Sequence, residues 1–507
     1  MHFYPRAREK RPSIHHPSVR PRRLAILKAA TLNLLLLQAL FLGLFSYVFG
    51  SLFQQRTHIH NLNVLFVDYD GGAIGDSVRI AYDKLKGPEF PSLIEHSATL
   101  YPQSSIVGDA VCNIGYWGAL YTSPNASNQL TAAFSGGSAA SVYDRSDVLT
   151  MVWNQARYPA VVDTALANSL KALAEAARVA YSIKNGQQTL QDLNSSDPAA
   201  LAALYEPWTL SSINIQPTSQ GSRLIYNTLV IILVIIQEFF YLGYVNGLYV
   251  QFKLYTSVAP HRIAIARQLI SAIYTLVGSL CATGAIWAFR NGWHVNGNQF
   301  VLTWVSLWLF AHLNFLVLDV FTVWLPPPYI PMALISWVVL NSTSVLLPFD
   351  LSPGFYHWGY ALPANSIYQI FIDIWSGGCN PQLDYALPTL FAYEIVAMAL
   401  STIGVYRRAH YACIAQEQDE KSCQDTIAAA LVDLRPALAM GQKTMQDGGG
   451  RGALEPEKEG GTGTQQSTSA MVLTEQEKLV NIMRHEMLRA KADVENSEMT
   501  FALPFKD

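Results

Sequence analysis

The stretch AATLNLLLLQALFLGLFSYVF, residues Ala29–Phe49, is the first of six apolar runs in this chain and sets its fold class. A helix of about 20 apolar residues crosses the roughly 30 Å hydrocarbon core of a bilayer. After a long polar stretch, five more such runs follow: Leu224–Tyr249, Ala266–Phe289, Gln299–Phe321, Tyr329–Leu347 and Leu387–Val405. The pattern predicts an α-helical polytopic membrane protein with six transmembrane helices in a 1+5 arrangement.

The polar stretch between the first two spans has the features of a folded domain. Val64–Val67 is a short apolar run ended by Asp and Gly, which is typical of a buried strand. Ile74–Leu85 and Pro159–Ile183 carry apolar residues at helical spacing. Strands that alternate with helices predict a small α/β domain.

These features divide the chain into five expected segments. They are a disordered basic cytoplasmic N-terminus at 1–23, a first span at 24–53, an extracytoplasmic α/β domain at 54–222, a five-helix membrane domain at 223–410, and a cytoplasmic, mostly disordered tail at 411–507.

The charge distribution predicts the orientation in the membrane. The chain is 50% hydrophobic and 14% charged with net charge −3, so no global basic field favours nucleic-acid binding. Lys and Arg cluster before the first span, whereas Pro348–Ala386 contains neither. Since basic residues stay cytoplasmic, we expect both termini inside, with Lys253, Arg262 and Arg267 in a cytoplasmic loop. A cleaved signal peptide is the weaker alternative.

Soluble-type catalytic motifs are missing from the sequence. There is no P-loop, no H-E-x-x-H and no G-x-S-x-G, and the Cys and His spacings match no metal site. Asp68 and Asp70 stand at a strand end, where carboxylates ordinarily accept hydrogen bonds from backbone N–H groups. We therefore expect no enzyme and no cofactor.

Polar residues inside the spans are the stronger functional candidates. Glu238 lies mid-way in the second span, Asp319 in the fourth and Glu394 in the sixth. An ionisable side chain at that depth is costly and marks a pathway by default. The alternative is hydrogen bonding between helices that holds the bundle together, and His312 and Asn314 are open to the same two interpretations.

Covalent modification is expected on the outer side. Asn125 and Asn194 are sequons in the expected outer domain, whereas the sequon at Asn341 falls inside a span. Cys112 and Cys379 both lie on the oxidising side and are candidates for a disulfide. The alternative for both cysteines is a small apolar filler of the core.

Between the last two spans, the aromatic segment Phe355–Trp375 is interrupted by Pro and Gly. Aromatic residues without basic neighbours are typical of an interfacial or re-entrant helix. A packed cap on the outer side is the alternative.

Four stretches of the sequence resemble the fungal nitrosoguanidine-resistance membrane proteins. That family is similar to bacterial phage-infection proteins and to the permease half of type-two ABC exporters. They are NLNVLFVDYDG at Asn61–Gly71, YWGALYTSP at Tyr116–Pro124, SPGFYHWGYALP at Ser352–Pro363 and IWSGG at Ile374–Gly378. The resemblance covers roughly Arg23–His410 and supplies no catalytic residue.

The resemblance implies a permease-like protein that acts in resistance to toxic compounds or in lipid or drug export. Its expected partners are the lipid bilayer, a lipid or hydrophobic substrate, and a separate ATPase or a second copy of the chain. The expected location is the plasma membrane, reached through the secretory pathway. A non-transporting regulator or scaffold that affects membrane lipid composition is the alternative.

Overall fold

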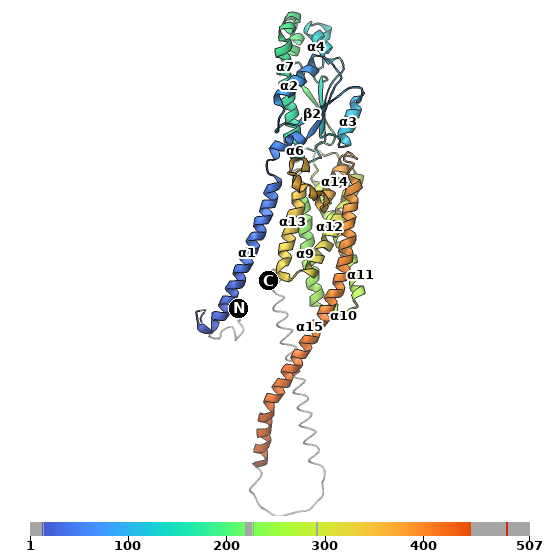
Figure 1. The fold of residues 1–507 in the computed structure, drawn as a ribbon. Coiled ribbons are helices and arrows are strands. Elements are labelled where there is room, and N and C mark those ends of the chain that lie inside the picture. The colour runs from blue at the N-terminus through green and yellow to red at the C-terminus, as the bar shows by residue number, and fades with distance from the viewer. Residues whose placement is uncertain are drawn as a thin grey trace, which may run out of the picture. The chain divides into compact units, whose positions relative to one another are not determined.

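The structure is a computed structural model that describes Ser13 and residues 15–218, 226, 228–290, 293–447 and 483–484, with side chains in the last long helix up to Ala429. Within these residues, six helices are long and apolar enough to cross a membrane, and Figure 1 shows their arrangement in the ribbon. They are α1 (Arg20–Ser51), α9 (Leu229–Gln251), α11 (Pro260–Ala288), α12 (Gly297–Trp324), α13 (Ile330–Leu346) and α15 (Leu383–Asp447). The protein is an integral membrane protein, as expected.

Helix α1 presents almost its whole surface to the surroundings. Only Leu44 and Ser51 are buried along it. Near its C-terminal end, the ring of Tyr47 contacts Tyr356, and a Cβ on Gly50 would lie 2.2 Å from the Tyr356 hydroxyl oxygen. The helix therefore presents most of its length to lipid, and near its C-terminal end it contacts Tyr356.

The basic N-terminus becomes helical earlier than expected. A 3₁₀ turn at Pro17–Val19 leads into α1 at Arg20, although disorder was predicted through residue 23. Proline in the first turn favours helix initiation because its fixed φ suits the helix and its missing N–H would be unpaired anyway. Residues 1–12 and 14 lie outside the described residues.

A five-stranded mixed sheet forms between α1 and α9 in the chain. Its order is β2-β1-β3-β4-β5, and only the β3–β4 pair is antiparallel. The strands are β1 (Asn63–Asp68), β2 (Ser92–His96), β3 (Gly118–Thr122), β4 (Leu149–Trp153) and β5 (Leu210–Asn214). The helices among them are α2 (Ala73–Leu85), α3 (Ser104–Cys112), α4 (Ala126–Phe134), α5 (Ser138–Val142), α6 (Pro159–Val161), the π-helical turn Val162–Ala167, α7 (Asn168–Asp192) and α8 (Pro198–Tyr205).

The strand β1 is buried on both faces. Leu65 and Val67 pack with Val107 and Val111 of α3. Phe66, on the opposite face, lies beneath the guanidinium of Arg79 in α2. Such a strand reads as a continuous apolar run rather than an alternating one, which is the pattern of Val64–Val67.

The segment between α13 and α15 is a packed cap. Two 3₁₀ turns (Phe349–Leu351 and Gly354–Ala361) precede α14 (Pro363–Trp375), which is buried at every position except Asp373 and Ile374. Tyr368 of α14 accepts a hydrogen bond from Tyr158 N (3.2 Å) and donates one to Ala156 O (3.3 Å). Of the two interpretations of this segment, the packed cap is the one seen.

The loop after β4 contains the residues that bond to Tyr368 of α14. All residues from Asn154 to Tyr158 are buried, and Tyr158 has a left-handed φ of 50°. The Arg157 guanidinium lies 4.1 Å from the Trp117 ring centroid and donates to Tyr116 O (3.2 Å). Burial lowers the pKa of Arg157 to about 10. The contacts between this loop and α14 therefore attach the sheet to the membrane helices on which α14 packs.

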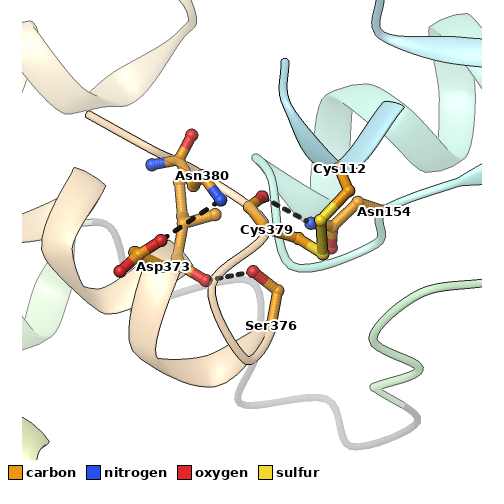
Figure 2. The surroundings of a disulfide bond; sticks show 7 residues. Cys112, Asn154, Asp373, Ser376, Cys379 and Asn380 are labelled. Atoms are coloured by element: carbon orange, nitrogen blue, oxygen red, sulfur yellow. Dashed lines mark hydrogen bonds between the residues drawn. A yellow bond between two sulfur atoms is a disulfide. The ribbon is translucent and has the colours of Figure 1, made fainter. Parts of the chain in front are cut away.

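A disulfide also joins α3, which packs on the sheet, to the segment that follows α14 (Figure 2). Cys112, the last residue of α3, is bonded to Cys379, which follows α14, with an S–S distance of 2.08 Å. The Asn154 side chain donates to the Cys379 carbonyl oxygen (3.4 Å). The bond closes a loop of the chain with a sequence separation of 267 residues.

Helix α15 runs beyond its expected end. The tail was predicted to be mostly disordered from residue 411, yet the helix continues to Asp447. This stretch is rich in Ala and Gln, which have high helix propensity. Helices and sheet up to Val405 belong to one compact unit, while the short helix α10 (Leu254–Ser257) falls mostly with the second unit, which also holds α15 from Tyr406 on.

Candidate functional site

Helix α11 is polar on its buried face and apolar on its exposed face. Leu269, Ile273 and Val277 are 60%, 62% and 55% exposed. From the second turn on, the buried positions recur every four residues: Arg267, Ser271, Thr275, Ser279 and Thr283. A lipid environment accounts for this reversal, because the apolar face contacts lipid and the polar face contacts other helices.

Arg267 forms a fully buried ion pair with Asp319 of α12. The Nη2–Oδ1 distance is 2.7 Å, and the side chains are 1% and 0% exposed. Arg267 Nη2 also donates to Asn246 Oδ1 (2.8 Å), and Ser401 Oγ donates to Asp319 Oδ2 (2.6 Å). The four residues come from α9, α11, α12 and α15, so this cluster fixes four helices together.

The expectation that Arg267 lies in a cytoplasmic loop is therefore wrong. The residue is inside α11, and its charge is neutralised by Asp319. A sequence profile counts Arg267 as a loop cation because it cannot see a partner in another span. Arg262 is also inside α11, where it is exposed in the first turn, whereas Lys253 lies before that helix.

A second polar pair lies at His312 of α12. Its Nδ1 is 2.6 Å from Glu394 Oε1 of α15, and its Nε2 is 3.1 Å from Ser271 Oγ of α11. Ser271 Oγ is also 2.9 Å from the Gln268 carbonyl oxygen. The imidazole therefore bridges an acid on one helix and a hydroxyl on another.

Glu238 of α9 differs from both other acids. It is 1% exposed, and within the described residues neither carboxylate oxygen has a hydrogen-bond partner. One turn along, the rings of Tyr241 and Tyr274 stack with centroids 3.4 Å apart. A buried carboxylate without donors carries a proton or awaits a cation, because the unpaired charge is very costly in a low-dielectric interior.

Helices α9 and α11 approach closely beside Glu238. A Cβ on Gly278 would lie 2.3 Å from Gln237 Nε2, so the end of the Gln237 side chain lies directly against the Gly278 backbone. Gln268 of α11 also has a buried side-chain oxygen without a hydrogen bond in the described part of the chain. The interface between these two helices is thus closely packed but incompletely hydrogen-bonded.

Asn314, the other polar residue noted in the fourth span, has both amide atoms bonded. Its Nδ2 donates to Phe310 O (2.7 Å), and its Oδ1 accepts from Trp337 Nε1 (2.8 Å). It connects α12 to α13. This is the helix-packing role named as the alternative for such residues.

The candidate acids therefore do not form one cluster. Asp319 and Glu394 have separate basic partners, and Glu238 has none among the described residues. Sequence reasoning did not identify Ser271 or Thr283 as site residues, and it misplaced Arg267. Their four-residue spacing was a usable signal, since small polar residues at that step lie on one helix face.

The candidate modification sites also have defined surroundings. Asn125 and Asn194 are exposed, whereas Asn341 is fully buried and accepts a hydrogen bond from Ala364 N (3.1 Å). Asp68 accepts hydrogen bonds from Gly71 N and the Thr122 hydroxyl, and Asp70 accepts them from the backbone N–H and the hydroxyl of Ser127. Among the described residues, no group of three or more His, Cys, Asp or Glu side chains is placed to hold a metal ion.

Comparison with known proteins identifies a family, and the relatives that match include a distant yeast protein. No solved structure matches the chain. An uncharacterized endoplasmic reticulum membrane protein of Saccharomyces cerevisiae is 19% identical over 401 residues, which cover 71% of this chain and 76% of the yeast protein. Residues 33–399 match the family model described as "Protein of unknown function (DUF3533)". Because that match takes in well over half of the residues, the chain belongs to this family of membrane proteins of unknown function.

Proposed function

We propose that this protein is a permease that moves a lipid or a hydrophobic small molecule across or within the membrane, and thereby confers resistance to toxic compounds. The observation that carries the proposal is Glu238, a buried acid without a hydrogen-bond partner in the described structure, among acids that have them. A purely structural acid is selected together with its donors. An acid without donors is suited to a transient partner, such as a cationic amphiphile or a polar head group.

Access to Glu238 requires the helices to move. The carboxyl is 1% exposed, and the close approach at Gly278 holds α9 against α11. The stacked rings of Tyr241 and Tyr274 would separate with those helices. Alternating access of this kind, by movement of one group of helices against another, is typical of permeases.

The proposed topology is the 1+5 arrangement, with residues 54–222 as an extracytoplasmic α/β domain and both termini cytoplasmic. The Cys112–Cys379 disulfide supports it, because disulfides persist in oxidising compartments. The exposed sequons Asn125 and Asn194 lie in the same segment. The yeast relative is described as an endoplasmic reticulum protein, so this membrane and the plasma membrane are both candidate locations.

This topology has a direct test. Protease added to sealed right-side-out vesicles should cleave the sheet region and spare tags on both termini. Glycosidase should shift the band of the wild type, and the N125Q/N194Q double variant should lack that shift. A C-terminal tag digested from outside would overturn the topology.

In this proposal the protein is a permease without enzymatic activity, and it does not hydrolyse ATP by itself. The sequence lacks a P-loop, so the energy must come from a partner ATPase or from an ion gradient. Purification in mild detergent, followed by identification of bound proteins, separates these two sources.

The transport proposal is tested by the accumulation of a fluorescent lipophilic cation, such as rhodamine 6G, in cells that lack their own copy of the protein. Cells rescued with the wild-type chain should accumulate less dye than cells with an empty vector. Equal accumulation, tested across several lipophilic cations and lipid analogues, would contradict the proposal.

The alternative is a non-transporting regulator of membrane lipid composition. The observation that favours it is the rigid junction of the sheet with α14, since a sensor must transmit changes from its outer part to the bilayer. Altered lipid composition with unchanged dye accumulation would support this alternative.

A further inference from the structure

The His312 imidazole makes contacts that serve two protonation states without any movement of heavy atoms. Nδ1 faces a carboxylate oxygen at 2.6 Å, and Nε2 faces a hydroxyl oxygen at 3.1 Å. A hydroxyl can donate or accept, and a carboxyl group can be charged or neutral. Each of the two contacts is therefore a good hydrogen bond in either direction.

We propose that the His312–Glu394 pair is a proton-binding site, loaded through Ser271, and that the proton is the coupling ion of the protein. This inference rests on the proposed transport function and names its energy source.

The loading step conserves atoms and charge. Before it, neutral His312 donates its Nδ1 proton to the Glu394 carboxylate, and its Nε2 accepts from the Ser271 hydroxyl. An incoming proton binds Nε2, and the Nδ1 proton passes to Glu394 Oε1. Afterwards the acid is neutral, His312 is again neutral, and Ser271 accepts from Nε2 while it donates to the Gln268 carbonyl oxygen at 2.9 Å. One proton is gained, and the pair changes from one negative charge to none.

The neighbouring ion pair cannot work in this way. Arg267 keeps its proton at any physiological pH, so its contact with Asp319 has a single protonation state. Arg267 precedes Ser271 by one helical turn, and its positive charge disfavours a lasting imidazolium there. That charge favours transfer of the proton onward to Glu394, which leaves no added cation beside Arg267.

The buried face of α11 supplies a route to Ser271 from one end of the helix. Thr275, Ser279 and Thr283 continue that face, and the rise of 12 residues is about 18 Å at about 1.5 Å per residue. The Thr283 hydroxyl is buried and has no hydrogen bond within the described residues. It lines a small hollow together with Gln299, Thr303 and the rings of Trp287, Trp293 and Trp375.

The hollow is lined mainly by apolar side chains, and its polar groups come from Thr283, Gln299 and Thr303. The Thr303 and Gln299 side chains already donate to Gln299 O (2.7 Å) and Ile374 O (2.8 Å), so the Thr283 hydroxyl, unpaired among the described residues, is the group that a water molecule in the hollow would bind. In the proposed topology this end of α11 faces the outer side. Protons would therefore enter from outside, which is the direction of the proton gradient at an energised plasma membrane.

Other titratable side chains lie on the helices packed about the pair. They are Glu238, Tyr241, Tyr244 and Tyr249 of α9, His261, Arg262, Arg267, Tyr274 and Cys281 of α11, Asp319 of α12, Tyr368 and Asp373 of α14, and Asp384, Tyr385 and Tyr393 of α15 as far as Val405, and α13 has none. Of the buried acids among them, only Glu238 has neither carboxylate oxygen hydrogen-bonded within the described residues. It is the residue that an experiment must distinguish from Glu394.

The experiment is infrared difference spectroscopy of the full-length protein in lipid nanodiscs, titrated from about pH 5 to pH 8, the range in which histidine side chains in general change charge. Acidification should increase the C=O stretch of a neutral carboxylic acid. The gain should be lost in E394Q and lost or displaced in pH in H312Q. It should remain in E238Q and in the control S401A, whose hydroxyl contacts Asp319 instead. Gel filtration verifies that each variant is folded.

The proposed proton route along α11 is tested with a separate variant, T283V. T283V replaces the unpaired hydroxyl with a methyl group of similar size, and it should slow proton uptake after a pH jump while leaving the end point unchanged. S271A should displace the pH of uptake, because Nε2 loses its partner. A T283V rate equal to that of the wild type would overturn the proposed route.

The outcomes separate this proposal from the transport function. A wild type without the acid-dependent carboxyl signal, or a signal that survives in E394Q, overturns the proton site even if dye accumulation responds to the protein. An intact signal, in a protein that changes dye accumulation at no external pH, overturns the transport function and with it the coupling role. If both proposals hold, dye accumulation in wild-type cells should depend on external pH, and that dependence should be lost in E394Q.

Discussion

The carboxyl groups of Asp68 and Glu238 are both almost inaccessible to solvent, but their surroundings differ in the hydrogen-bond donors they provide. Asp68 ends strand β1, where it accepts hydrogen bonds from Gly71 N (3.0 Å), Thr122 Oγ1 (2.7 Å) and Arg79 Nη2 (2.7 Å). Glu238 lies within α9 and has no hydrogen bond in the described part of the chain. A strand end offers free backbone donors, whereas inside a membrane helix the backbone groups bond to one another. A membrane acid must therefore find its partner on another helix, as Asp319 and Glu394 do.

The largest effect on stability is expected from breaking the ion pair between α11 and α12. D319A leaves Arg267 as an uncompensated buried cation, and such losses cost about 3–5 kcal/mol. The thermal unfolding of the protein in detergent should show a clear drop. The matched control is the R267M/D319L double variant, which removes both charges and should recover most of the loss. A double variant no more stable than D319A would contradict this account.

The disulfide comes next in expected size. Removing the Cys112–Cys379 bond in C112S/C379S should lower the stability of the oxidised protein by about 2–4 kcal/mol, because the bond closes a long loop. C281S changes an exposed free cysteine and serves as control. Denaturant unfolding with and without reductant measures the difference. If the wild type unfolds identically with and without reductant, the Cys112–Cys379 disulfide does not form in solution.

A smaller loss is expected at the end of strand β1. D68A leaves the buried Thr122 hydroxyl without its acceptor and removes the acceptor of Gly71 N, which costs about 1–3 kcal/mol. D76A, which removes an exposed acid on α2, should stay within about 0.5 kcal/mol of the wild type. Hydrogen exchange of the sheet amides resolves the two variants. Equal protection in both would mean that Asp68 is not a structural acid.

Much of the membrane part was predictable because hydropathy alone identifies a span. Each of the six apolar runs overlaps an observed long helix, and the helix boundaries differ by a few residues or more at several ends. Residues 224, 225 and 227 of the second run lie outside the described residues. The strand predicted at Val64–Val67 corresponds to β1, since its apolar run ends at a turn rich in Asp and Gly. The strands β2 and β5 gave no signal, because Ser92–His96 and Leu210–Asn214 are short and partly polar.

What the sequence lacked was the pairing between spans. Glu238, Asp319 and Glu394 looked alike as isolated acids, and only the packing of α9, α11, α12 and α15 distinguishes them. Arg267 looked like a loop cation for the same reason. The burial of α14 was equally hidden, since aromatic residues with Pro and Gly are typical of a membrane interface as well as of a packed cap.

The smallest effect on stability, with the largest effect on function, is expected at Glu238, and it tests the central claim most directly. E238Q keeps the size of the side chain and removes an acid that has no hydrogen bond in the described structure, so its melting should match that of the wild type. Cells that lack their own copy, rescued by either form at matched expression, should be compared for growth under toxic challenge. The account predicts that E238Q reaches the membrane, melts like the wild type and fails to restore resistance. Full rescue by E238Q would contradict the account and return Glu238 to a packing role.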